Sequence, residues 1–291
     1  MAKTQIGDIQ IETVVEECDM AGTPQENFPD ATEELVRLHV DWLAPDAYDP
    51  DSNQLIMPTQ AYVVRSGRHT VVIDTCIGNN KRHDANYPNW SNRTDFKLLE
   101  DMTAMGVHPE EVDYVMCTHL HVDHCGWNTR LQDGRWVPSF PNARYIFNQR
   151  ELTFAEDQVR VANDVTYEDS VLPILESGQA VVVDNEFALD DALWLEPTPG
   201  HTPGHVAVRM RSREQNGVMS GDLIHTPLQL AYPDWSPVYD DDPAEGARTR
   251  RRFLEQQCDQ DILMMTAHFP LPSMGRVVSQ GDGFRFRYLD P

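Results

Sequence analysis

Alternating apolar and polar positions predict short β-strands along most of the chain. Residues 6–18 alternate as one strand or a hairpin. Residues 59–66 and 70–74 are two β-rich runs joined by Ser66-Gly67-Arg68-His69, which predicts a hairpin. The apolar run at residues 112–117 is typical of a buried strand. Shorter strands are predicted at residues 144–147, 180–183, 193–196, 206–210, 218–220, 262–265, 276–279 and 284–288.

Apolar residues at helical spacing predict helices between these strands. One spans residues 93–105 and stops at Gly106, and another spans residues 243–257, where Pro243 suits the first turn. The same spacing predicts helices at residues 149–161 and 170–176. Residues 20–58 differ, because they are rich in Pro, Asp and Asn. They predict a long, mostly irregular segment that either covers a site or wraps the surface.

The order of these elements indicates the fold class. Each half of the chain contains several β-runs and then helices, which favours two sheets packed face to face with helices outside. This is a layered α/β sandwich rather than a doubly wound parallel sheet. We expect a single domain over residues 1–291, in which residues 1–58 form an N-terminal strand plus the irregular segment.

Composition excludes several classes of partner. The chain has 23 Lys and Arg against 47 Asp and Glu, a formal net charge of -24. Such a surface repels phosphate backbones and anionic lipid, so no nucleic acid and no membrane is expected as a partner. The 5 cysteines are widely spaced without a C-x-x-C pair, which argues against a disulfide framework. The first residues lack the apolar core of a signal peptide, so we expect a cytoplasmic protein, with a homodimer as a reasonable assembly.

The densest group of chemically active side chains is His119-Leu120-His121-Val122-Asp123-His124. It directly follows the apolar run at residues 112–117. In an extended segment His119, His121 and Asp123 would share one face, and a turn at Asp123 could bring His124 to the same side. Histidine nitrogens and carboxylate oxygens are metal ligands, so this stretch predicts a site for two neighbouring metal ions.

Three later residues could complete such a site. His201 lies in a Gly/Pro loop, while Asp222 and His268 each follow a β-rich run. Strand ends are where a rigid sheet can aim side chains into one cleft. Asp74 also ends a predicted strand, and it could either orient a metal-bound histidine or simply form a turn.

The ordered pattern His119-x-His121-x-Asp123-His124, then His201, Asp222 and His268, resembles the metallo-β-lactamase superfamily of metal-dependent hydrolases. Asp74-Thr75 and the loop from Thr198 to His205 are similar to further motifs of that family. The resemblance implies a four-layered αβ/βα sandwich made of two mixed sheets flanked by helices. It also implies that His119, His121 and His201 hold one metal, that Asp123, His124 and His268 hold the other, and that Asp222 bridges them. His205 matches no ligand of the family, so a role in filling the loop is expected for it.

Differences within the family narrow the predicted activity. Where one lactam-cleaving class of the family has a Cys, this chain has Asp222, as lactonases, thioesterases and phosphodiesterases of the superfamily do. His121 stands where flavodiiron relatives have a Glu, which disfavours an electron-transfer role. The resemblance is to the branch that contains lactonases and an organophosphate hydrolase. It predicts a small-molecule substrate.

The predicted mechanism is dinuclear hydrolysis, in which a metal-bridging hydroxide attacks an ester or lactone carbonyl. The N and O ligands suit two divalent ions, with zinc expected and Mn, Fe or Co also compatible. Asp123 would relay the proton to the leaving oxygen. His225 occupies a position where homoserine-lactone hydrolases of the family carry a Tyr, and it could donate a similar hydrogen bond or face solvent. The alternatives are a phosphotriester or thioester hydrolase on the same site and a non-hydrolytic di-metal oxidoreductase.

Some residues outside this set also have two interpretations. The basic residues of the 243–257 helix are expected to form a solvated face. Cys125 is expected to be a small packing residue rather than a reactive thiol. The basic positions are Arg248, Arg250, Arg251 and Arg252. Four aromatic residues are candidates for either a pocket wall or the core: Trp127, Phe140, Tyr232 and Trp235.

Overall fold

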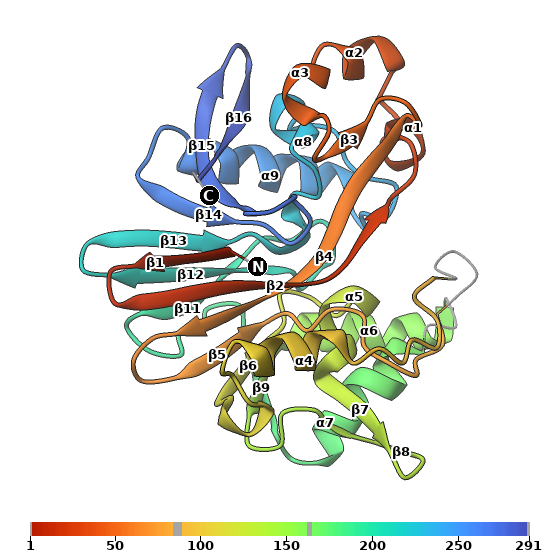
Figure 1. Ribbon diagram of the computed structural model, residues 1–291, viewed down its shortest axis with the longest axis vertical. Helices are drawn as coiled ribbons and strands as arrows, with labels where there is room; N and C mark the ends of the chain where they lie inside the picture. Colours follow the sequence, from red (N-terminus) through yellow and green to blue (C-terminus); the bar gives the residue numbers. More distant parts are fainter. Residues whose placement is uncertain (1, 84–88, 162–164, 290–291) are drawn as a thin grey trace.

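The first of two main β-sheets is built largely from the N-terminal half of the chain (Figure 1). The computed structural model describes residues 2–83, 89–161 and 165–289. The first sheet has the order β1-β2-β4-β5-β6-β9-β10, and β3 pairs with β4. Its strands are β1 (Ala2–Ile6), β2 (Ile9–Met20), β3 (Tyr48–Asp49), β4 (Gln54–Arg65), β5 (Thr70–Ile73), β6 (Tyr114–Met116), β9 (Arg144–Asn148) and β10 (Ala180–Val183).

The second main sheet has six strands in simple chain order, β11 to β16. A separate hairpin, β7 (Thr129–Gln132) and β8 (Arg135–Pro138), stands apart from both sheets. The predicted strands therefore occur, and most differ from their predicted ends by a few residues. The second sheet contains β11 (Leu193–Pro197), β12 (Val206–Ser212), β13 (Gln215–Met219), β14 (Ile262–Met265), β15 (Met274–Gln280) and β16 (Gly283–Tyr288).

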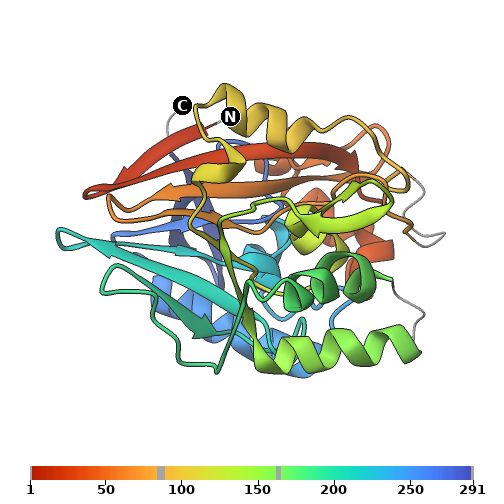
Figure 2. The ribbon, with the colours of Figure 1, turned by 90° about the horizontal axis from the view of Figure 1, so that it is seen from below.

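Helices cover the outer faces of the sheets. Figure 2 shows α4 on the outer face of the first sheet and the second sheet on the opposite face of the first sheet. Helices α6 and α9 have the predicted bounds, while a π-helical turn at Tyr167–Val171 precedes α7. The α-helices are α1 (Pro24–Asn27), α2 (Glu33–Arg37), α3 (Val40–Leu43), α4 (Lys97–Ala104), α5 (Val122–Cys125), α6 (Gln149–Val161), α7 (Leu172–Glu176), α8 (Leu228–Ala231) and α9 (Pro243–Gln257).

Side-chain alternation in the strands produces separate hydrophobic layers. On β4, Tyr62 and Val64 pack in the cluster between the two sheets, whereas Val63 packs in the cluster beneath α4, α6 and α7. On the far side, Phe253 and Leu254 of α9 pack on the outer face of the second sheet. These clusters confirm the layered α/β sandwich with helices outside.

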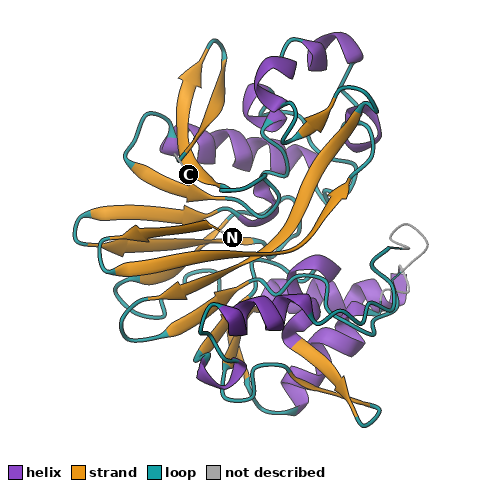
Figure 3. Ribbon diagram, viewed as in Figure 1, coloured by secondary structure: helices purple, strands orange, loops and turns teal. Residues whose placement is uncertain are grey.

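The N-terminal segment is more regular than its sequence predicts. Residues 20–58 contain α1, α2 and α3, and β4 begins at Gln54 instead of residue 59 (Figure 3). Helix α1 forms because Thr23 and Glu26 make a capping box, in which each satisfies a backbone N–H of the other. These helices share their own apolar cluster with Leu228 of α8 and with Trp235.

Strand directions bring several chain segments to one edge of the sandwich. β5, β6 and β9 run parallel in the first sheet, and β13 and β14 run parallel in the second. The carboxyl ends of parallel strands meet at one edge, so the residues following β5, β6, β13 and β14 lie near one another. Among the described residues, no helix has the length and apolar composition needed to cross a membrane.

Candidate metal centre

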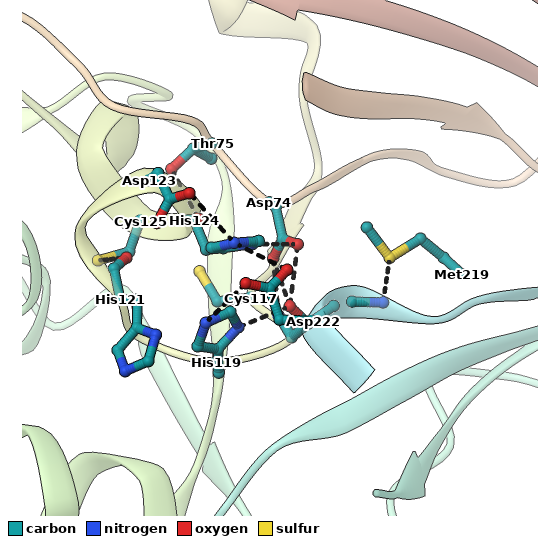
Figure 4. Close-up of polar contacts among 12 residues, drawn as sticks. Asp74, Thr75, Cys117, His119, His121, Asp123, His124, Cys125, Met219 and Asp222 are labelled. Carbon is teal, nitrogen blue, oxygen red and sulfur yellow. Dashed lines mark hydrogen bonds and ion pairs between the residues drawn. The ribbon is translucent and has the colours of Figure 1, made fainter. Parts of the chain in front are cut away.

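The stretch from His119 to His124 changes conformation in its middle. His119 and His121 lie in the irregular segment after β6, whereas Asp123 and His124 belong to the helical turn α5. The expectation of an extended segment with a turn at Asp123 is therefore wrong from Val122 onward, because the backbone there adopts helical dihedral angles. The side chains nevertheless converge, and Figure 4 shows His119 and His124 directed toward Asp222.

The first group of convergent atoms comes from three histidines on two loops. His201 Nε2 lies 3.2 Å from His119 Nε2 and 2.9 Å from His121 Nδ1. The potential ligand atoms of these residues all lie within 4.8 Å of one another. Three imidazole nitrogens at this spacing can coordinate a single metal ion.

The second group joins α5 to the loop after β14. Asp123 Oδ2 lies 3.7 Å from His124 Nε2 and 3.6 Å from His268 Nε2. These ligand atoms also lie within 4.8 Å of one another. The structure thus brings together the two ligand sets that the family resemblance implies.

Asp222 lies between the two groups, on a 3-10 turn at Gly221–Leu223 that follows β13. Its Oδ1 is 3.1 Å from His124 Nε2 and 3.1 Å from His268 Nε2. Its Oδ2 is 3.7 Å from His119 Nε2 and 3.5 Å from His201 Nε2. Oδ2 also lies 3.3 Å from His268 Nε2, so the carboxylate as a whole stands between the two groups. This is the position that a bridging carboxylate needs.

Outer acceptors fix the orientation of the convergent imidazoles. His124 Nδ1 lies 2.9 Å from Asp74 Oδ2, and His201 Nδ1 lies 2.9 Å from Asp240 Oδ1. His268 Nδ1 donates to the Pro58 carbonyl at 2.8 Å. When Nδ1–H is donated outward, the Nε2 lone pair faces the centre of the site, and this is the tautomer that binds metal.

The centre contains polar atoms that a cation would satisfy. His124 Nε2 and Asp222 Oδ1 are buried and make no hydrogen bond, although they lie only 3.1 Å apart. Burial lowers the pKa of His201 and His119 well below the usual histidine value, so both imidazoles are neutral. Burial opposes charge on His124 as well, yet Asp222 and Asp123 outweigh it and raise its pKa well above the ordinary value. The carboxylates thus favour positive charge at this point, and the residues fit two divalent cations.

A cavity of about 800 Å³ opens onto the cluster. Ligand atoms from both groups line it, together with an apolar and aromatic wall. That wall is contributed by the end of β2, β4, the segment before α4, α5 and the loop before α9, so it combines parts of the chain that are far apart in sequence. Its members are Met20, Met57, Trp90, Val122, Val238 and Tyr239.

His225 lies inside this cavity and does not face solvent, since it is 2% exposed. Its Nε2 lies 3.1 Å from Asp222 Oδ2, and its ring is 4.9 Å from that of Tyr239. Among the described residues, neither of its ring nitrogens makes a hydrogen bond. His225 is therefore placed to donate to a molecule in the cavity, and it could also coordinate metal together with His201 and Asp222.

His205 fills a loop and also supports Asp222. The Asp222 N–H donates to His205 Nε2 at 3.0 Å, and His205 Nδ1 lies 2.8 Å from Thr198 Oγ1. Burial lowers the pKa of His205 to about 3, so the ring is neutral and can accept that hydrogen bond.

Glu151 was not singled out by sequence reasoning, yet it joins the two ligand-bearing loops. It accepts hydrogen bonds from the Leu120 N–H at 3.0 Å, from Thr202 Oγ1 at 2.7 Å and from the Gly204 N–H at 3.1 Å. The one available signal was a Glu in the first turn of α6, where acidic residues are ordinarily explained by the helix dipole.

The structure bears on three further expectations about side chains outside the ligand set. The prediction of a solvated basic face is wrong for Arg250, which is 1% exposed. Cys125 is a buried residue of the core, as expected. The four aromatic candidates belong to hydrophobic clusters and do not line the cavity: Trp127, Phe140, Tyr232 and Trp235.

Comparison with known proteins identifies the family. The model of the metallo-beta-lactamase superfamily matches residues 56–267, and the chain therefore belongs to this superfamily. Among curated proteins, the N-acyl homoserine lactonase of Bacillus cereus is 23% identical over 177 residues, which are 57% of this chain and 63% of that protein. The N-acyl homoserine lactonase AttM of Azorhizobium caulinodans is 31% identical over 144 residues, 48% of this chain and 49% of that protein. The chain thus spans less than two thirds of the length of either relative.

Solved structures with the same fold cover almost the whole chain. The crystal structure of the hydrolase AbOPH of the beta lactamase superfamily has a TM-score of 0.82 and 22% identity, covering 99% of this chain and 97% of that one. AidC, described as a dizinc quorum-quenching lactonase in complex with a product, has a TM-score of 0.80 and 20% identity with the same coverage. These similarities confirm the αβ/βα sandwich predicted from the sequence.

Proposed function

We propose that this chain is a two-metal hydrolase that opens small lactones or esters. The observation that carries the proposal is the position of Asp222, whose carboxylate lies between two groups of candidate metal ligands and lines a cavity of about 800 Å³. Cavities of this size are typical of small-molecule sites. Two nearby ligand groups joined by a carboxylate are typical of dinuclear hydrolases.

The proposed ligands follow from the geometry. His119, His121 and His201 would hold one divalent ion; Asp123, His124 and His268 would hold the other; and Asp222 would bridge them. All are N or O donors, which suits zinc and also Mn, Fe or Co. The chemistry that such ions supply when bound is polarisation of a carbonyl and activation of water at neutral pH.

Two residues of the chain would act on the substrate. Asp123 lines the cavity and is the more exposed of the two central carboxylates, with 12% side-chain exposure against 5% for Asp222. We assign it the transfer of a proton to the leaving oxygen. His225 would donate a hydrogen bond to the substrate carbonyl and so stabilise negative charge that develops on that oxygen.

The wall of the cavity favours a lactone with an apolar tail. Met20, Met57 and Val238 offer aliphatic surface, and Trp90 and Tyr239 offer aromatic surface. The curated relatives are named N-acyl homoserine lactonases, which supports a lactone as the first substrate to test. Phosphotriester and thioester hydrolysis are the alternatives on the same residues, and a di-metal oxidoreductase is the alternative of another class.

The decisive experiment is a substrate panel run on protein of measured metal content. The panel contains an acyl homoserine lactone, an aryl ester, a thioester, a phosphotriester and a β-lactam. We expect two metal ions per chain, fastest turnover of the lactone, and loss of activity after chelation or in His121→Ala. Full activity after complete metal removal, or oxygen consumption without hydrolysis of any member of the panel, would rule the proposal out.

A further inference from the structure

Arg250 is a buried charge in the middle of helix α9. Its side chain is 1% exposed, although the neighbouring Arg251 is 38% exposed and pairs with Asp234 at the surface. A guanidinium cannot lose its charge in a protein, so burying one is costly unless its donors are satisfied. The contacts of Arg250 therefore indicate what it does.

Every nitrogen of the Arg250 guanidinium has a specific acceptor. Nε donates to the Leu223 carbonyl at 2.7 Å. Nη1 donates to the carbonyls of Pro233 at 3.0 Å and Trp235 at 2.8 Å, and Nη2 donates to Asp240 Oδ2 at 3.2 Å. This fan of donors matches the planar fork of arginine, and a lysine ammonium could not reproduce it.

These acceptors lead to both ligand groups of the metal centre. Asp240 uses its other oxygen, Oδ1, to hold His201 Nδ1 at 2.9 Å. Leu223 directly follows Asp222 on the same 3-10 turn. Arg250 is thus connected to His201 through Asp240, and to Asp222 through its chain neighbour Leu223.

The same contacts fix the loop that forms part of the cavity wall. Pro233, Trp235 and Asp240 lie on the connection between α8 and α9, which also carries the cavity-lining Val238 and Tyr239. Arg250 therefore holds both ends of the segment that presents this wall.

The backbone packing of α9 supports the same role. The Asp242 N–H donates to the Gly200 carbonyl at 2.9 Å, and the Asp241 N–H donates to the His201 carbonyl at 3.0 Å. A Cβ on Gly200 would lie 2.2 Å from the backbone nitrogen of Gly246, so α9 can approach this loop only because Gly200 is a glycine. Helix α9 is therefore seated directly on the loop that carries His201.

We propose that Arg250 is a positioning residue: it holds Asp240 and the Leu223 carbonyl in place, and so sets His201 and Asp222 at the spacing that two metal ions require. This inference rests on the proposed two-metal function. A purely structural buried ion pair predicts a different outcome, because breaking it would destabilise the metal-free and the metal-loaded protein alike and leave zinc affinity unchanged.

The test measures metal affinity separately from stability. The variants are Arg250→Lys, Arg250→Met, Asp240→Asn, the double variant Arg250→Met/Asp240→Asn and the control Arg251→Met. Each is stripped of metal, checked for folding by circular dichroism, and titrated with zinc against a chromogenic chelator. Melting temperatures are recorded for the metal-free and metal-loaded forms.

A positioning role predicts about a tenfold or greater loss of zinc affinity in Arg250→Met, a smaller loss in Arg250→Lys and wild-type affinity in Arg251→Met. The loss of zinc-binding free energy in the double variant should be smaller than the sum of the losses in Arg250→Met and Asp240→Asn, because Arg250 acts in part through Asp240. The melting temperature should fall further in the metal-loaded form than in the metal-free form.

Wild-type zinc affinity in folded Arg250→Met, or equal losses of melting temperature with and without metal, would overturn the inference. If Arg250→Met does not fold, the same criteria apply to Arg250→Lys. A wild-type protein that binds no zinc would instead contradict the proposed function itself, so the two failures are distinguishable.

Discussion

The carboxylate of Asp74 holds His124 in one orientation, with its Oδ2 2.9 Å from His124 Nδ1. Its other oxygen, Oδ1, accepts a hydrogen bond from the Thr118 N–H at 2.7 Å. Asp74 therefore ties the end of β5 to the segment that carries His119 and leaves the Nε2 lone pair of His124 facing Asp222. Of its two sequence interpretations, the structure favours the orienting role, although Asp74 also adopts a turn conformation with φ of 56°.

Replacing Asp74 by Asn should weaken metal binding without straining the backbone, because Asn tolerates positive φ. An amide has one oxygen, and if that oxygen accepts from Thr118, the amide NH₂ faces His124 Nδ1. The ring must then accept at Nδ1 and carry its proton on Nε2, where the metal should bind. We expect about a 10- to 100-fold loss of zinc affinity, measured by chelator competition.

Asp113→Asn is the matched control for this substitution. Asp113 is an exposed carboxylate that accepts a hydrogen bond from the Thr70 N–H at 2.8 Å, without contact to the metal-ligating residues. It should leave zinc affinity unchanged. Equal affinities in the wild type and Asp74→Asn would mean that Asp74 serves only as a turn residue.

His205→Ala should lower stability but leave the number of bound metals unchanged. The substitution leaves the buried Asp222 N–H without its acceptor, which costs about 1–3 kcal/mol. Urea unfolding measures this loss, and elemental analysis at saturating zinc measures the metal content. We expect two ions per chain in His205→Ala and fewer in His201→Ala. A loss of one ion in His205→Ala would show that His205 is itself a ligand.

The proposed metal ligands were predictable from the sequence because four of them form one dense motif and the other three lie shortly after predicted strands. Their supporting residues were harder to predict, since Asp240 contacts His201 across 39 residues and Arg250 contacts Leu223 across 27. No local sequence pattern indicates either of these two contacts. One signal was nevertheless present: Arg250 lies three and four residues before the buried Phe253 and Leu254, so it shares their face of the helix.

The N-terminal helices were missed for a different reason. They are too short to show a full apolar period, and the Pro and Asp content of residues 20–58 resembled that of a loop. Thr23-Pro24-Gln25-Glu26 is nevertheless a capping-box motif with a proline in the first turn, which is a local signal for a helix start.

Glu151 should make stability depend on pH. Burial raises its pKa to about 7 from the ordinary glutamate value of 4.5, against the hydrogen bonds that it accepts from Thr202, Leu120 and Gly204. A carboxyl group with a raised folded-state pKa favours the folded protein when protonated, so this contribution is full below about pH 4.5 and is lost as the pH rises through about 7. Because of this group, the free energy of unfolding of the wild type should be greater at pH 5 than at pH 8 by on the order of 3 kcal/mol.

Glu151→Gln cannot ionise, so the pH-dependent part should disappear in this variant. The measurement is urea unfolding of both metal-free proteins at pH 5 and pH 8, because the histidines titrate alike in each and cancel in the comparison. If the difference between the two pH values is the same for the wild type and Glu151→Gln, the Glu151 carboxyl does not titrate in this range.

His225 can be tested as either a hydrogen-bond donor or a metal ligand, because its position allows both. Its ring stacks on His268 with centroids 5.7 Å apart, and its Nε2 lies 3.1 Å from Asp222 Oδ2. A donor would stabilise the oxyanion that develops on the substrate carbonyl, and such donors contribute about 100-fold or more to kcat. A ligand would instead determine how many ions the protein holds.

The matched pair His225→Phe and His225→Tyr separates these roles. Phenylalanine removes the donor and tyrosine restores an O–H, so we expect kcat for the lactone to fall about 100-fold in His225→Phe and to recover to within about tenfold of the wild type in His225→Tyr. Both variants should retain two zinc ions per chain by elemental analysis. Loss of an ion in His225→Phe would make His225 a ligand, and equal kcat values in the two variants would exclude hydrogen bonding by this residue.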